Sequence, residues 1–132
     1  MKLNQVSLPA TDLARAVAFY RRLGYGLIVL NDHYARLENP FDLSTLSLVL
    51  APAVGEGAHI YLECDDLDAR VEALKTCGVT FDSGPQDQSW LWREAWLQDS
   101  EGNRLCLYFA GDNRRFPPWR IGDSARADDL NA

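Results

Sequence analysis

The sequence predicts an α+β fold of two tandem βαβββ modules, which form an open, cleft-bearing mixed sheet with helices on its outer face. Three observations support this prediction: a helical segment occurs twice, strand-like runs surround each copy in the same order, and turn-forming residues separate the runs. Three consecutive strands after one helix favour a mixed or antiparallel sheet that helices cover on one side. The other face is then open to a ligand.

The duplication is clearest in the two helical segments, residues 11–24 and 65–78, which superpose with a shift of 54 residues. The identical pairs are Asp12 and Asp66, Leu13 and Leu67, Val17 and Val71, and Gly24 and Gly78. An Asp or Thr near the start of each helix can accept hydrogen bonds from the free N–H groups of the first turn. A Gly after the end can adopt the left-handed conformation that closes a helix. Each segment therefore predicts an amphipathic helix of about three turns.

Short apolar or alternating runs predict the strands. Around the first helix these are Leu3–Leu8, Leu27–Leu30, Tyr34–Leu37 and Thr45–Leu50. Around the second helix they are His59–Glu63, Val79–Phe81, Leu91–Leu97 and Arg104–Phe109. Residues typical of turns lie between the runs, at Asn31-Asp32, Asn39-Pro40, Ser83-Gly84-Pro85 and Ser100-Glu101-Gly102-Asn103.

The two modules are expected at residues 1–53 and 54–110, as halves of one domain, followed by a C-terminal tail at 111–132. The tail holds two adjacent prolines, which exclude a helix there. We expect Phe116 and Trp119 to dock the tail onto the body of the protein, while the last residues fray.

Composition excludes several classes of function. Hydrophobic residues make up 47 % of the 132 residues and charged residues 24 %, which argues against intrinsic disorder. No apolar run approaches the roughly 20 residues that span a bilayer, and the N-terminus lacks a secretory signal, so we expect a cytoplasmic protein without a membrane partner. The net charge of −6, without a basic block, argues against a nucleic-acid partner. Cys64, Cys77 and Cys106 fit neither a disulfide framework nor a CxxC metal site and are expected to be buried thiols.

Two motifs on this frame resemble signatures of the vicinal oxygen chelate superfamily, which includes glyoxalase I, bleomycin-resistance proteins and extradiol dioxygenases. The helix from Asp12-Leu13 to Phe19-Tyr20-Arg21-Arg22-Leu23-Gly24-Tyr25 resembles the signature D-L-x-x-x-x-x-F-Y-x-x-L-G-F. Asp99-Ser100-Glu101-Gly102-Asn103-Arg104-Leu105 resembles the D-P-x-G-N-x-I turn into the final strand. The resemblance covers about residues 3–110. It implies a small organic ligand and a homodimer in which modules of both chains line each cleft.

The resemblance also implies positions for a divalent metal, held by a His or Gln on the first strand of each module and a Glu on each last strand. Carried over by position, the first strands supply Gln5 and His59. Cys106 stands where the second Glu is expected, and the last strand of the first module has no carboxylate. Because catalytic zinc normally has three protein ligands, we expect the metal site to be missing and no cofactor to be bound. The alternative is a divalent metal on His59 and Gln5, with a carboxylate such as Glu94 or Glu63.

Strand alternation predicts which side chains lie on the open face. Ligand-binding residues are expected at Gln5, His59, Tyr61, Trp92, Glu94, Trp96, Cys106 and Tyr108. Trp92 and Trp96, with Glu94 between them, predict an aromatic wall with one negative charge, suited to a planar or cationic ligand. The alternative is that these tryptophans fill a dimer interface or the core.

The sequence thus predicts a glyoxalase/bleomycin-resistance-like protein that binds a small organic molecule and lacks the family metal site. The alternative function is a metal-dependent lyase, isomerase or dioxygenase that uses His59 and Gln5. His59 is also a candidate general base, because its unperturbed pKa of ~6.5 is useful near neutrality. Neither the ligand nor the presence of a reaction follows from the fold, since pocket chemistry on one scaffold varies with the side chains.

Overall fold

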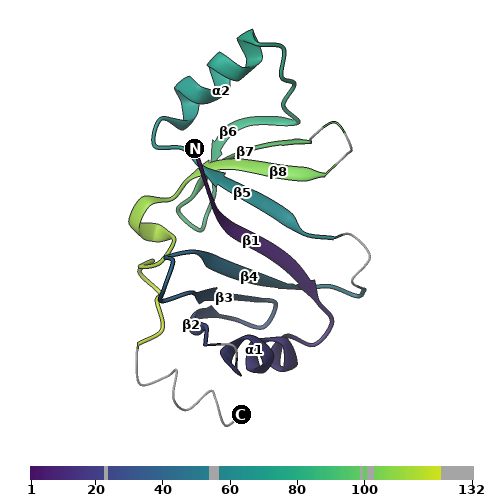
Figure 1. Ribbon diagram of the computed structural model, residues 1–132, viewed down its shortest axis with the longest axis vertical. Helices are drawn as coiled ribbons and strands as arrows, with labels where there is room; N and C mark the ends of the chain where they lie inside the picture. The colour runs from purple at the N-terminus through teal and green to yellow at the C-terminus, as the bar shows by residue number, and fades with distance from the viewer. Residues whose placement is uncertain (23, 54–56, 99, 101–102, 123–132) are drawn as a thin grey trace.

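The computed structural model confirms the α+β class and the repeated βαβββ modules (Figure 1). It describes residues 1–22, 24–53, 57–98, 100 and 103–122. Parts of the predictions lie outside these residues: Leu23 of the helix motif, residues 54–56 at the start of the second module, Asp99, Glu101 and Gly102 of the turn motif, and residues 123–132 of the tail. The first module contains β1 (Lys2–Ala10), α1 (Leu13–Arg22), β2 (Gly26–Leu30), β3 (Tyr34–Glu38) and β4 (Thr45–Leu50). The second contains β5 (His59–Glu63), α2 (Leu67–Thr76), β6 (Ser83–Asp87), β7 (Arg93–Gln98) and β8 (Arg104–Phe109), followed by a short 3₁₀ helix, Gly111–Asn113.

The strands of the described chain form one mixed sheet in the order β2-β3-β4-β1-β5-β8-β7-β6. At its centre β1 pairs antiparallel with β5, so that Gln5 lies opposite Tyr61 and Ser7 lies opposite His59. On either side, β1 pairs parallel with β4, and β5 pairs parallel with β8. The strand order of the second module mirrors that of the first about the β1–β5 pair. The duplication therefore becomes a pseudo-two-fold arrangement within a single chain.

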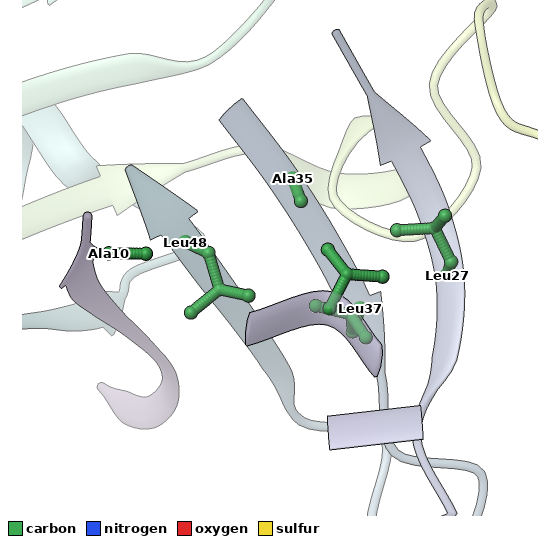
Figure 2. Packing of buried hydrophobic residues seen from close by; sticks show 6 residues of the cluster. Ala10, Leu27, Ala35, Leu37 and Leu48 are labelled. Carbon is green, nitrogen blue, oxygen red and sulfur yellow. The ribbon is translucent and has the colours of Figure 1, made fainter. Parts of the chain in front are cut away.

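Each helix covers its own half of the sheet, and the two helices lie at opposite ends of the molecule (Figure 1). Alternate strand residues, such as Ala35 and Leu37 of β3, point to the helix side (Figure 2). They belong to one buried cluster with Val17 of α1. The second module repeats this packing with a cluster that consists of Cys64, Leu67, Val71, Ala95, Leu97 and Leu107. Among the described residues, neither helix is long and apolar enough to cross a membrane.

The helix ends follow most of the predicted signals. The side chain of Asp12 accepts a hydrogen bond from the backbone N–H of Arg15 at 3.0 Å, which confirms this cap. Asp66 makes no side-chain cap bond, so the same prediction is wrong for the second helix. Gly24 and Gly78 have φ angles of 104° and 92°, which confirms that both helices end on a left-handed glycine.

The strand predicted at Val79–Phe81 is wrong, because β6 instead runs from Ser83 to Asp87, across the predicted turn. β6 is an edge strand, and an edge position tolerates Pro85, which has no backbone N–H to donate. The next strand begins at Arg93 and not at Leu91. Leu91 has a φ of 67°, a conformation that a strand does not continue through.

The prediction that all three cysteines are buried holds for two of them. Cys64 and Cys106 are buried, whereas Cys77 is exposed. Cys77 is the C-cap residue directly after α2 and before Gly78, so it lies at the surface end of the helix. Burial raises the pKa of Cys64 and of Cys106, which favours the neutral thiol at both positions.

Residues 110–122, which we call the strap, run from the second module to the first, past the ends of the central strands (Figure 1). The strap starts at Ala110, whose backbone N–H donates to the carboxylate of Glu63 at 2.8 Å. Arg114 then donates through Nη1 to the backbone oxygen of Asn4 at 3.2 Å and to the hydroxyl of Thr45 at 3.1 Å. The strap thereby connects β5 with β1 and β4.

The far end of the strap is held on β3 and β2. Arg115 and Arg120 both donate to the carboxylate of Glu38, with a shortest distance of 2.7 Å. The backbone N–H of Ile121 donates to the backbone oxygen of Ile28 at 2.8 Å.

Hydrogen bonds from arginine side chains therefore attach the strap to the sheet. Packing of the two aromatic side chains, which the sequence predicted, contributes less. Phe116 remains 55 % exposed and Trp119 remains 44 % exposed. Their side chains are too accessible to hold the segment by burial alone, because the hydrophobic gain scales with the apolar area removed from water.

Replacing Glu38 by Gln is expected to release the strap. Burial raises the pKa of Glu38, but the hydrogen bonds and charges of Arg120 and Arg115 outweigh it and hold the pKa below its ordinary value of 4.5. The stabilisation is therefore complete above pH 4.5 and is lost as the pH falls through the lower folded-state pKa. We expect Glu38→Gln to reduce the free energy of unfolding by about 1.5–3 kcal/mol at neutral pH, measured by urea denaturation. Trypsin should also cleave faster after Arg115 and Arg120.

The matched control for this prediction is Asp68→Asn. Asp68 accepts hydrogen bonds from Nε and Nη2 of Arg93 at 2.9 and 3.0 Å, but this ion pair is largely exposed. Exposed ion pairs contribute little to stability, so the control should change neither the unfolding free energy nor the cleavage rate appreciably. Equal cleavage rates in the wild type and in Glu38→Gln would contradict the role of Glu38.

Candidate functional site

A pocket of about 430 Å³ lies on the face of the sheet opposite the helices. Both modules and the strap contribute to it. Its lining consists of Gln5, Ser7, Val29, Asn31, His33, Tyr34, Arg36, Val49, Tyr61, Ser89, Trp90, Trp92, Glu94 and Trp119. This volume is within the range of pockets that enclose small organic molecules.

Four of the eight predicted ligand-binding residues line the pocket: Gln5, Tyr61, Trp92 and Glu94. The other four are His59, Trp96, Cys106 and Tyr108, which lie on neighbouring strand positions but outside the pocket lining. Cys106 and Tyr108 are fully buried, whereas His59 and Trp96 are half-buried. The structure thus brings half of the predicted set together.

Tyr61 lies at the centre of an aromatic cluster. Its ring makes edge-to-face contacts with Trp92 at 5.9 Å, with Trp96 at 5.5 Å and with Tyr108 at 5.5 Å, measured between ring centroids. Trp92 stacks on Tyr108 with a centroid distance of 4.7 Å. Because these contacts fix one another, the aromatic wall is rigid before any ligand arrives.

Trp92 belongs both to the pocket wall and to the core. It is only 2 % exposed, and its indole N–H donates to the backbone oxygen of Asn113 in the strap at 3.2 Å. Of the two alternatives for the tryptophans, the core therefore applies to most of the Trp92 ring. Trp90, by contrast, lines the pocket and remains substantially exposed.

Glu94 is buried beneath this wall and holds two indole rings in place. One carboxylate oxygen accepts from the indole N–H of Trp90 at 2.7 Å, and the other accepts from that of Trp96 at 3.0 Å. Burial raises the pKa of Glu94, and this effect exceeds the opposing effects of the two indole hydrogen bonds and of the positive charge on Arg36. Binding of a cation by Glu94 stays a prediction, but the carboxylate already has neutral donors on both oxygens.

Arg36 is a site residue that sequence reasoning missed. Its side chain is 3 % exposed, and its guanidinium lies over the ring of Trp92, 4.6 Å from the centroid. Nε donates to the hydroxyl of Tyr34 at 3.0 Å. Nη1 donates to the backbone oxygens of Asn113 at 3.4 Å and Arg114 at 3.1 Å. One guanidinium therefore joins β3, the aromatic wall and the strap.

A signal for Arg36 was present in the sequence. The β3 residues alternate, with Tyr34, Arg36 and Glu38 on the face opposite to Ala35 and Leu37. This alternation places the three polar side chains on the ligand face. Trp119 had no comparable signal, because it reaches the pocket through the path of the strap and not through a periodic pattern.

The residues present do not fit the metal site of the catalytic superfamily members. Gln5 already accepts a hydrogen bond from the hydroxyl of Thr45 at 2.7 Å, and His59 packs edge-on against Trp96. Burial raises the pKa of Cys106, so the thiolate that a metal would need is disfavoured. Within the described ranges, no group of three His, Cys, Asp or Glu residues is placed to hold a metal ion. Without a carboxylate, Gln5 and His59 are fewer ligands than a catalytic divalent metal requires. The carboxylates of Glu94 and Glu63 already accept hydrogen bonds from N–H groups.

Comparisons with known proteins agree with the fold. The family model described as Glyoxalase/Bleomycin resistance protein/Dioxygenase superfamily matches residues 2–107. A hypothetical protein from Bacillus halodurans C-125 is 20 % identical with a TM-score of 0.66, covering 82 % of this chain and 93 % of that chain. A glyoxalase/bleomycin resistance protein/dioxygenase superfamily member from Vibrio splendidus 12B01 is 14 % identical with a TM-score of 0.65, covering 82 % of this chain and 99 % of that chain.

A further similar structure is that of a larger enzyme. The 2,3-dioxygenase LapB from Pseudomonas sp. KL28 is 16 % identical with a TM-score of 0.68, covering 93 % of this chain but only 44 % of that chain. No curated protein matches this chain. At these identities the solved structures show the shared fold alone, whereas the family model covers most of the chain. The chain therefore belongs to the glyoxalase/bleomycin resistance protein/dioxygenase superfamily, as the two sequence motifs predicted.

Proposed function

We propose that this protein binds a planar small organic molecule in the pocket between its two modules, without the divalent metal of catalytic superfamily members. The observation that carries the proposal is a preformed aromatic pocket whose donor set does not fit a metal. Trp90 and Trp119, which line the pocket and remain substantially exposed, provide flat apolar surfaces for a ring system. The runner-up function, a metal-dependent lyase, isomerase or dioxygenase that uses His59 and Gln5, has less support, because no group of three His, Cys, Asp or Glu residues among the described residues is placed to hold a metal ion.

The rigidity of the wall supports binding as the function. Trp92 is held by its stack on Tyr108 and by its hydrogen bond to Asn113, and Glu94 fixes the indole of Trp90. A ligand that enters such a site orders few additional side chains, so less conformational entropy opposes binding. Ligand specificity then depends on the polar groups that remain free along the wall.

Trp119→Ala is expected to weaken ligand binding with little effect on stability. Trp119 lines the pocket from the strap, and loss of one aromatic contact corresponds to about 0.5–1.5 kcal/mol, or roughly a two- to tenfold increase in Kd. The neutral probe 2-naphthol, titrated by isothermal calorimetry, measures this change. Phe116→Ala is the matched control, because Phe116 belongs to the same strap but not to the pocket lining. If Trp119→Ala and Phe116→Ala bind 2-naphthol with equal affinity, the ligand does not contact Trp119.

The metal prediction is tested by elemental analysis. Protein purified without a chelator should contain well under one equivalent of divalent metal per chain, and His59→Ala should leave that content unchanged. Inductively coupled plasma mass spectrometry measures the content, before and after dialysis against Ni, Mn, Fe or Zn salts. Cys77→Ser serves as the control for surface binding, since Cys77 is exposed and lies outside the pocket lining. Stoichiometric metal that disappears in His59→Ala alone would favour the metal-dependent alternative.

The homodimer implied by the family resemblance and the cytoplasmic location both stay predictions. One chain provides residues from both modules to the pocket, so the proposed binding does not require a partner. A dimer would have a native mass near twice 14.8 kDa, which light scattering at micromolar concentration detects. A monomer that still binds 2-naphthol would contradict the dimer and leave the binding proposal intact.

A further inference from the structure

We infer that the ligand of this pocket is an acid, namely a planar aromatic molecule with a carboxylate or similar oxyanion whose charge partner is the guanidinium of Arg36. The inference rests on the proposed function, because it names the ligand class of the same site. Three independent features of the described residues carry it.

The first feature is that Arg36 is a buried cation without a carboxylate partner. No ion pair within the described chain joins Arg36 to an acidic side chain, although the side chain is nearly inaccessible. Other arginines in the protein do have such partners: Arg93 pairs with Asp68, and Arg120 pairs with Glu38. A desolvated charge is costly unless it is compensated. The chain compensates Arg36 in part, through hydrogen bonds, the ring of Trp92 and the more distant charge of Glu94, but it provides no direct ion pair, and a ligand anion would provide one.

The second feature is a pair of unused N–H groups on the same guanidinium. Nε and Nη1 are occupied by the hydroxyl of Tyr34 and by two strap carbonyls. Nη2 makes no hydrogen bond with any described residue, and it is not among the fully buried nitrogens without a hydrogen bond, so it is accessible to solvent. Since Arg36 lines the pocket, we place the two free N–H groups of Nη2 on the pocket side.

The third feature is that neutral donors share the pocket with Arg36. Thr45 accepts a hydrogen bond from Arg114 and therefore gives its own hydroxyl hydrogen to Oε1 of Gln5. This network orients the Gln5 amide with Nε2 unbonded among the described residues. The Tyr61 hydroxyl is also unbonded there, and burial raises its pKa, so it remains a donor at neutral pH. A ligand oxyanion can accept hydrogen bonds from Arg36, from the Gln5 amide and from the Tyr61 hydroxyl. An ammonium group cannot accept a hydrogen bond from any of them.

Glu94 does not reverse this preference. It is the carboxylate that lines the pocket, but its two oxygens already accept the indole N–H groups of Trp90 and Trp96. The protein as a whole has a net charge of −6, which repels anions in general. A measured preference for an anion must therefore come from the local donors.

The test compares three naphthalene probes of equal size on the full-length protein: 2-naphthoate, neutral 2-naphthamide and 2-naphthylmethylammonium. Isothermal calorimetry at pH 7 gives the three dissociation constants. A charged hydrogen bond corresponds to roughly a tenfold or larger gain in affinity, so 2-naphthoate should bind at least about tenfold tighter than the amide. The ammonium compound should bind weakest.

Variants then assign the preference to Arg36. Arg36→Met should bring the ratio of the two dissociation constants, naphthamide over naphthoate, down to about one. The matched control is Arg104→Met, since Arg104 lies over the ring of Trp96 at 4.7 Å but outside the pocket lining. Because Arg36 also holds the strap, Tyr61→Phe provides a milder variant that removes one donor and keeps the ring. It should weaken naphthoate binding several-fold and leave naphthamide binding nearly unchanged.

Each outcome separates the inference from the proposed function. Binding of the amide or the ammonium compound as tightly as naphthoate would overturn the acid ligand but leave a planar-ligand pocket. An equal loss of the naphthoate preference in Arg104→Met would overturn the role of Arg36. Absence of binding by all three probes and by 2-naphthol would overturn both the inference and the proposed function.

Discussion

The antiparallel pairing of β1 with β5 is the interaction on which the rest of this structure depends. It joins two modules, each with its own helix-side core, into one continuous sheet. The same pairing places Gln5 opposite Tyr61 and thereby brings the polar residues of the first module against the aromatic residues of the second. Without this pair neither module would contain a complete pocket, because each supplies only part of the lining. The functional site is thus a product of the duplication and not of either copy.

A buried polar network on the ligand face reinforces that pairing. The Asn113 carbonyl accepts from both Trp92 and Arg36, so one strap residue holds the aromatic wall and the cation together. Glu94 performs a similar role for Trp90 and Trp96. A buried polar group is costly unless it is hydrogen-bonded. Once it is hydrogen-bonded, it favours one arrangement of the side chains around it. The network explains how a pocket rich in large aromatic side chains keeps a defined shape.

Local patterns in the sequence predicted the elements that depend on local physics. The bounds of β5 and β8, the left-handed Gly24 and Gly78, and the Asp12 cap all follow from periodicity and turn chemistry. Long-range contacts account for most of the rest: the path of the strap, its arginine attachments and the burial of Arg36 depend on residues about 80 positions apart. The edge strand β6 was missed because its Ser-Gly-Pro start has the composition of a turn. No local rule distinguishes a turn of this composition from an edge strand that tolerates proline.

The bond from Ile121 to Ile28 has a consequence for self-association. An open sheet ends in two edge strands whose unpaired backbone groups can template aggregation with another chain. Here the strap occupies part of the β2 edge, and Pro85 removes a donor from the β6 edge. Both ends of the sheet are therefore poor templates for strand addition. The strap that shapes the pocket thus also protects the fold against edge-to-edge polymerisation.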